Sequence, residues 1–146
     1  MKLLPTILAS FIFLTLFPAA NGYVGEIAVI VNAAGPLTEI SEADIREIYL
    51  GNMKVAGGVA IVPIHYKEGP VKDKFLSSII GMDSKSYRLY WTKKVFQEGG
   101  SLPVSQNNPQ LIMLLVRKNA GAIGYVPASE LDEVEGIKII TKIKAE

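Results

Sequence analysis

The residues with the most evident chemical capacity gather in the stretch "HYKEGPVK", residues 65–72. His65 is the only histidine of the chain, and an imidazole can act as a general base because it titrates near neutral pH. It lies at the end of a predicted strand, next to Tyr66, Lys67 and Glu68. A lone histidine at a strand end is more often a surface or packing residue than a catalytic one. We therefore expect no catalytic residue at this position.

The same stretch has the chain geometry of a small anion-binding site. A strand runs through a short turn into a helix that begins at Pro70. The first amides of that helix have no partner within the helix, and the helix dipole favours negative charge there. Lys67 and Lys72 lie nearby in the sequence, and Tyr66 offers a hydroxyl donor. In the alternative, water and Glu68 satisfy this end of the helix. The candidate anion-binding residues are Tyr66, Lys67, Gly69, Val71 and Lys72.

Other catalytic and ligand-binding motifs are absent from the sequence. No G-x-S-x-G elbow is present for a serine nucleophile, and the single histidine without any cysteine cannot make an ordinary zinc site. The acidic residues show no calcium-loop spacing, and the glycines form neither G-x-G-x-x-G nor a P-loop. The charged run "ELDEVE" (130–135) is typical of a solvated turn. We expect a protein that is not an enzyme and has no metal ion or cofactor.

Aromatic residues at helical spacing form a second candidate feature. Tyr87, Tyr90 and Trp91 could make a platform on which a ligand stacks, but aromatic residues at this spacing more often belong to a core. The Tyr125 hydroxyl either lines a cleft or caps the end of a strand. We expect Trp91 to be a core residue.

The N-terminal residues predict export from the cytoplasm. Residues 1–22 resemble a signal peptide, with Lys2 before an apolar run of about 15 residues and small residues around Ala20 to Gly22. That run is shorter than the roughly 20 residues that span a bilayer, although an uncleaved anchor is the alternative. We expect cleavage after Ala20 or Gly22, and a periplasmic or secreted domain of residues 23–146.

The charge balance of that mature domain argues against nucleic acid as a partner. Without Lys2, basic and acidic residues are equal in number, so there is no basic excess to bind phosphate backbones. The chain has no cysteine, which excludes a disulfide framework. Stability must therefore come from packing.

Apolar patterns predict four strands. "EIAVIVN" (26–32) is apolar enough to be a central strand covered on both faces. A second strand is predicted over 59–66, where Pro63 indicates an edge position or a bulge. "AGAIGYVPASE" (120–130) predicts a short buried strand over 122–126, because its glycines allow close approaches and Pro127 ends it. "GIKIITKI" (136–143) predicts the last strand.

Four helices alternate with these strands. "ISEADIREIYLGN" (40–52) has a capping box of Ser41 and Asp44. "EGPVKDKFLSSIIG" (68–81) predicts one helix with Val71, Phe75 and Ile79 along one face. "DSKSYRLYWTKKVFQEGG" (83–100) and "NNPQLIMLLVRKNAG" (107–121) predict helices capped by Asp83 and Asn108, and the unbroken LIMLLV run predicts deep burial of the last. The alternation predicts an α/β three-layer sandwich with a mixed, largely parallel sheet.

Several of these segments together resemble a known family. "PLTEISEADIREIYLGN", "AIVPIHYKEGPVKDKF", "YWTKKVFQEGGSLP" and "GAIGYVPASEL" resemble the phosphate-binding component of ABC-type phosphate transporters, above all its short single-lobed periplasmic relatives. The resemblance covers residues 24–142 and implies one lobe of a type II periplasmic binding-protein fold. It also implies phosphate as ligand and an ABC permease, or another envelope protein, as partner.

The chain departs from that family at the ligand-binding turn. The family has an arginine and a Ser-Gly-Thr run where this chain has Tyr66 and Pro70–Lys72, so the arginine fork and two hydroxyl donors are missing. The family also closes two lobes on its ligand, whereas this chain has the length of one lobe.

Two functions follow from this comparison. The first is a periplasmic or secreted solute-binding protein that holds phosphate or another small oxyanion weakly. The second is a single-lobe interaction module that uses the fold as a scaffold for a protein partner. A homodimer through the exposed cleft face would reconcile them by rebuilding a two-lobed cleft.

Overall fold

The computed structural model describes residues 24–132 and 134–145, and the expected signal peptide (1–22) lies outside this part of the chain. The main sheet has the strand order β5-β4-β6-β1-β7. Its strands are β1 (Ile27–Asn32), β4 (Val62–Tyr66), β5 (Val104–Gln106), β6 (Ala122–Pro127) and β7 (Ile137–Ile143). β1 runs antiparallel to both of its neighbours, whereas β4 is parallel to β5 and β6. β4, β5, β6 and β7 therefore run in one direction and β1 runs in the other. The sheet is mixed and largely parallel, as the sequence predicts.

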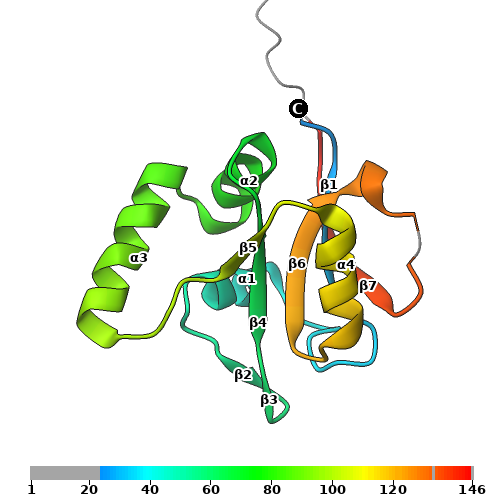
Figure 1. The fold of residues 1–146 in the computed structure, drawn as a ribbon, viewed down its shortest axis with the longest axis horizontal. Coiled ribbons are helices and arrows are strands. Elements are labelled where there is room, and N and C mark those ends of the chain that lie inside the picture. The colour runs from blue at the N-terminus through cyan, green and yellow to red at the C-terminus, as the bar shows by residue number, and fades with distance from the viewer. Residues whose placement is uncertain (1–23, 133, 146) are drawn as a thin grey trace, which may run out of the picture.

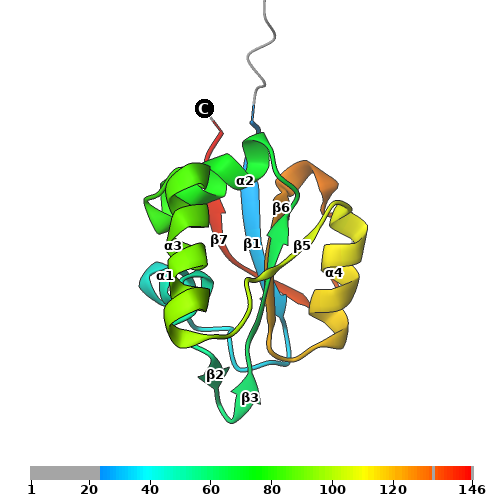
Figure 2. The same cartoon turned by 60° about the vertical axis from the view of Figure 1, so that its left-hand side comes forward.

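Helices cover both faces of this sheet (Figures 1 and 2). One face carries α1 (Glu42–Tyr49), α2 (Pro70–Phe75) and α3 (Ser84–Glu98), and the other carries α4 (Pro109–Lys118). Each face has its own apolar cluster: one surrounds Tyr49, Phe75 and Trp91, and the other surrounds Ile112 and Val116. These two cores and the sheet between them make the three-layer sandwich that the sequence predicts.

β1 is the central strand that its apolar run predicts. All six of its residues are buried, because β6 and β7 flank it and both faces are covered. The helix caps are also where the sequence places them. Ser41 and Asp44 form the reciprocal capping box of α1, and Asp83 and Asn108 accept bonds from the first amides of α3 and α4.

The strand expected over 59–66 is interrupted. Val59–Ala60 (β3) pairs with Val55–Ala56 (β2) in a small hairpin that turns at Gly57 and Gly58, and β4 begins only at Val62. Pro63 lies in an internal strand and not at an edge. The Val62 amide donates to the Gly121 carbonyl of the β6 side. Successive residues of a strand direct their backbone groups to opposite neighbours, so the Pro63 nitrogen faces β5. The pairing of β4 with β5 starts one residue later, at Ile64.

Two helix predictions need correction. The helix expected over 68–81 is α-helical only to Phe75 and continues as a π-helical segment, Leu76–Ile80. The wider π turn shifts the buried positions, so Leu76 and Ile80 face the core and the predicted Ile79 is only partly buried. α4 is not buried all round: Leu111 and Leu114 are exposed, because α4 packs on the sheet through one face only.

The glycines of the stretch 120–130 allow β6 to pack closely. A Cβ at Gly121 would collide with the carbonyl oxygen of Ala60, and one at Gly124 would lie 2.7 Å from Ile112 Cγ2. β6 can therefore pack closely against the β3–β4 segment through Gly121 and against α4 through Gly124. The stretch is a buried strand between α4 and a short 3-10 turn, as the sequence predicts.

Candidate functional site

The turn from β4 into α2 brings the predicted anion-binding residues to the carboxyl end of a parallel strand, but it does not aim them at one point. Tyr66 is partly buried and packs against both apolar clusters, whereas Lys67 is exposed. Gly69 precedes α2 with a φ of 137°, a conformation that favours glycine. Val71 lines a cavity on the other side of α2, together with Val24 and residues after β6. Only Lys72 of the predicted set faces the cavity described next.

Lys72 is a buried cation with a partner from its own turn. Its side chain is 10% exposed, and its Nζ lies 2.5 Å from Glu68 Oε1. The Glu68 side chain is 65% exposed, so the carboxylate reaches inward from solvent while the ammonium stays under cover. Glu68 thus pairs with the Lys72 ammonium, and the sequence alternative, in which water and Glu68 satisfy the amides at the start of the helix, stays a prediction.

A cavity of about 140 Å³ lies beside this ion pair, between the β4–α2 turn, the start of α3 and β5. Three of its polar residues were not among the sequence candidates: Ser84, Arg88 and Ser105. Ser84 and Arg88 lie on α3, and Ser105 reaches the cavity because β5 pairs with the carboxyl half of β4, where Ser105 lies opposite His65. That pairing joins segments 40 residues apart, so no local pattern could have found it. The full lining is His65, Glu68, Lys72, Ser84, Tyr87, Arg88, Leu102, Pro103 and Ser105.

His65 forms the inner wall of this cavity and is the centre of a buried hydrogen-bond chain. Its Nδ1 lies 2.8 Å from the Tyr125 hydroxyl and its Nε2 lies 2.9 Å from the Tyr87 hydroxyl. The Tyr87 hydroxyl donates its proton to the Tyr49 carbonyl, 2.7 Å away. Tyr87 can therefore only accept from His65, so Nε2 carries the imidazole proton and Nδ1 accepts from Tyr125.

This arrangement requires a neutral imidazole. Burial, and then the nearby charge of Lys72, lowers the pKa of His65 to about 3. Burial also raises the pKa values of Tyr87 and Tyr125 above the ordinary range, so both hydroxyls stay protonated. At neutral pH neither His65 nor the tyrosines bring charge to the cavity. His65 is a packing residue, as the sequence favours, and not a poised base.

The aromatic residues of α3 belong to the core, as the sequence favours. Tyr87 and Trp91 are 4% and 5% exposed, and the Trp91 indole donates to the same Tyr49 carbonyl at 3.2 Å. The Tyr90 hydroxyl donates to the Leu50 carbonyl. Tyr125 is fully buried and stacks on Phe75 with ring centroids 3.8 Å apart. The aromatic residues of α3 are therefore packing residues and not a platform for a ligand. Tyr125 is a packing residue as well and does not line an open cleft.

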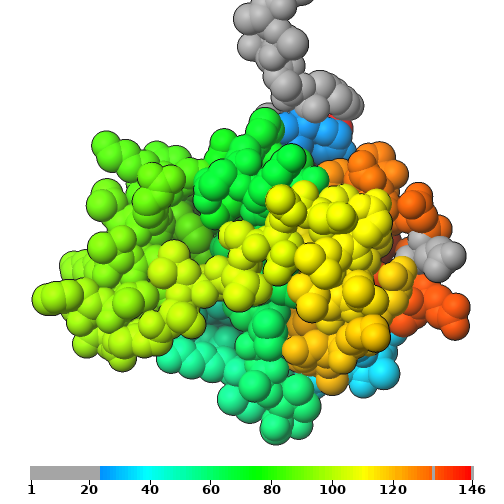
Figure 3. Space-filling view, in the orientation of Figure 1, coloured from blue at the N-terminus to red at the C-terminus, as the bar shows by residue number. Residues whose placement is uncertain are grey.

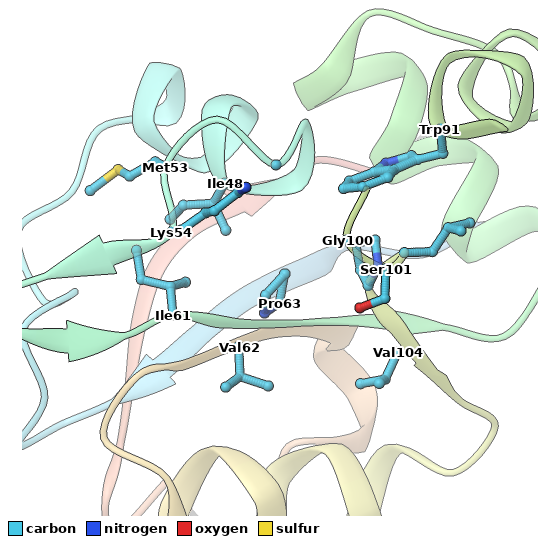
Figure 4. Close-up of a pocket in the computed structure, with 13 residues that line it drawn as sticks. Ile48, Met53, Lys54, Ile61, Val62, Pro63, Trp91, Gly100, Ser101 and Val104 are labelled. Atoms are coloured by element: carbon cyan, nitrogen blue, oxygen red, sulfur yellow. The ribbon is translucent and has the colours of Figure 1, made fainter. Parts of the chain in front are cut away.

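A second, apolar groove of about 380 Å³ lies along β4 between α1 and α3. Figure 4 shows Trp91 and Ile48 on the same side of β4 as Pro63, with Ser101 at the end near Trp91. Lys54 is the one charged residue in its lining. The groove suits an apolar group better than an anion.

Neither a metal cluster nor a membrane span occurs in the described part of the chain. Within residues 24–132 and 134–145, no three His, Asp or Glu residues gather closely enough to hold a metal ion. No helix within the same residues is long and apolar enough to cross a membrane.

Comparison with known proteins gives a likeness of fold only. No family model and no curated protein matches the sequence. Among solved structures, a phosphate ABC transporter substrate-binding protein from Clostridium perfringens, with bound phosphate, matches with a TM-score of 0.58 and 20% identity over 82% of this chain and 46% of that one. An ABC-type phosphate transport receptor from Vibrio cholerae matches with a TM-score of 0.58 and 17% identity over 82% and 47%.

A phosphate-binding protein from Planctomyces limnophilus gives a TM-score of 0.55 and 17% identity, with coverage of 81% of this chain and 42% of that one. The chain spans less than half the length of each of these proteins. It has an α/β fold that matches one lobe of phosphate-binding proteins.

The neutral His65 makes a prediction about pH. Because the unfolded chain binds a proton near pH 6.5 and the folded chain does not until about pH 3, folding stability should fall as the pH drops below 6.5. Between pH 7 and 5 the loss should be about 2 kcal/mol, measured by urea unfolding. The carboxylates with lowered pKa values, Glu39, Asp44 and Asp83, lose their contribution only at lower pH.

The matched control is His65→Gln, which removes the titrating group. The variant should be less stable at pH 7 but should show a flatter dependence on pH between 7 and 5. A wild-type stability that does not change over this range would contradict the assignment of a buried neutral imidazole.

Proposed function

We propose that the chain is an exported, non-enzymatic solute-binding domain that binds a small oxyanion such as phosphate weakly. The observation that carries the proposal is its fold, which matches one lobe of proteins named for phosphate. In this lobe the turn after β4 lies at the carboxyl end of a parallel strand and carries Lys67, and Lys72 follows in α2. Ligands of open α/β sheets bind at such strand ends. The single-lobe interaction module is not favoured by these neighbours.

Weak affinity follows from the composition of the turn. Tyr66, Lys67, Gly69, Val71 and Lys72 include no arginine, and the one buried cation already has a carboxylate partner. An incoming anion must displace that partner and is covered from one side only. Each charge-assisted hydrogen bond adds about 1.5–3 kcal/mol before desolvation, so two or three such bonds suggest a dissociation constant nearer millimolar than micromolar.

Export and partners complete the proposal. Cleavage near Ala20 to Gly22 would release residues 23–146 into the periplasm or the medium, where an ABC permease or another envelope protein would be the partner. N-terminal sequencing of the protein recovered from those compartments checks this, and a product that retains Met1 in the membrane would contradict it.

The binding proposal predicts a saturable phosphate titration. In calorimetry or amide NMR at low salt, inorganic phosphate should bind with an affinity on the order of millimolar, and added salt should weaken it because the turn is open to solvent. Lys72→Met keeps the apolar stem but removes the charge, and should weaken binding further. Lys93→Met, which removes an exposed charge from α3, is the control.

Either of two outcomes would contradict this proposal. One is the absence of saturable binding in the wild type. The other is sub-micromolar binding that survives Lys67→Ala combined with Lys72→Met, which would put the anion elsewhere.

We also propose a homodimer that covers exposed apolar side chains. Four of the eight strongly exposed large apolar residues in the described part lie between 89 and 104: Leu89, Phe96, Leu102 and Val104. Phe96 is 91% exposed on α3, the helix along one side of the molecule in Figure 3. The apolar groove shares Leu102 and Val104 with this set. Apolar surface of this kind is typical of an interface, and a second copy would supply the lobe that the longer neighbours contain.

Light scattering after size exclusion tests the dimer. The wild type should have twice the mass of one chain at tens of micromolar, and Phe96→Asp should be monomeric. Gln97→Asp adds the same charge one residue away without removing an apolar side chain, so it should remain dimeric. A monomeric wild type at that concentration would rule out this interface.

A further inference from the structure

We propose that the 140 Å³ cavity beside the β4–α2 turn is the anion site of this domain, and that Arg88 and Glu68 control its affinity. The anion is a small tetrahedral oxyanion, phosphate or sulfate. This inference rests on the proposed function and names its site, which differs from the turn itself. In this site the oxyanion binds Lys72, Arg88 and Ser105 and displaces the Glu68 carboxylate.

The charges of the lining favour an anion. Lys72 and Arg88 are cationic, Glu68 is the one carboxylate of the lining, and His65 is neutral. Its charged residues therefore sum to one positive charge while Glu68 is inside, and to two when it swings out. Lys72 is the buried member, and a buried cation without a partner is costly. The cavity thus requires an anion beside Lys72 at all times.

Glu68 meets that requirement in a way that can be reversed. Its side chain is 65% exposed and lies on a turn, so it can rotate into water without moving the fold. An ion pair with one exposed member contributes little to stability, so a dianion with more donors around it can outweigh this pair. Glu68 therefore acts as an internal competitor for the site.

Arg88 supplies the group that the β4–α2 turn lacks. No carboxylate among residues 24–132 and 134–145 forms an ion pair with its guanidinium, which is exposed on the first turns of α3 beside the cavity. A guanidinium presents paired donors that match two oxygens of a tetrahedral ion. Ser105 on β5 adds a hydroxyl from the opposite wall, whereas the Ser84 hydroxyl already donates to Asp73.

The size of the cavity limits the ligand. A volume of 140 Å³ holds about five waters at roughly 30 Å³ each, which suits an ion of five heavy atoms. Organic phosphates such as nucleotides need the several hundred Å³ of ordinary ligand pockets. We therefore expect inorganic anions to bind and nucleotides to be excluded.

The test is a titration of the purified protein and of three variants with inorganic phosphate and with sulfate. Arg88→Gln should weaken binding by about tenfold or more, as expected for loss of a charge-assisted bond. Glu68→Gln removes the competing charge and should tighten binding by up to about fivefold. Lys85→Gln removes an exposed charge from the same helix without touching the cavity, and should leave the affinity within about twofold. Amide NMR of the wild type should show the largest shifts at Lys72, Arg88 and Ser105.

The outcomes separate this inference from the proposed function. If the wild type binds but neither Arg88→Gln nor Glu68→Gln changes its affinity, the cavity is not the site, although the binding proposal stands. If Glu68→Gln weakens binding, Glu68 is part of the site and not its competitor, which also overturns the inference. If the wild type binds neither anion, both proposals fail.

Discussion

The position of α3 depends on a buried chain of hydrogen bonds that starts at the Tyr49 carbonyl. This oxygen, at the end of α1, accepts from both Tyr87 and Trp91 of α3, and Tyr87 in turn accepts from His65 of β4. These two aromatic residues are also the buried residues of α3. Apolar contact through two side chains alone would fix the position of α3 only weakly. The hydrogen bonds fix it further, because each broken bond would leave a buried polar group unpaired. A neutral His65 is therefore a condition for the placement of α3. The small cavity and the apolar groove along β4 depend on the same placement, because residues of α3 line both.

That placement explains why one small cavity can collect groups from three parts of the chain. Lys72 follows β4, Arg88 lies on α3 and Ser105 lies on β5. The matched part of this chain makes up less than half of each solved neighbour. In this chain α3 and β5 border the cavity from two sides, and the Glu68 carboxylate pairs with the buried Lys72 ammonium.

Local signals predicted the fold well. The apolar run of β1 and the caps at Ser41 and Asp83 each act within a few residues, so their consequences can be read along the chain. The π-helical segment after α2 and the half-exposed face of α4 were missed, because they depend on which element packs against them. Of the five predicted anion-binding residues, only Lys72 lines the cavity. Its other groups meet through the β4–β5 pairing and the contact of α3 with α1, and neither leaves a trace in local sequence.

The ionisation state and tautomer of His65 test this account most directly. The chain has one histidine, so the imidazole ¹⁵N signals in NMR need no assignment by mutation. We predict a neutral ring with its proton on Nε2, unchanged from pH 8 to 5, and an Nε2 proton that exchanges slowly with water. An imidazole that titrates near pH 6.5, or one with its proton on Nδ1, would contradict the hydrogen-bond chain and the placement of α3 that depends on it.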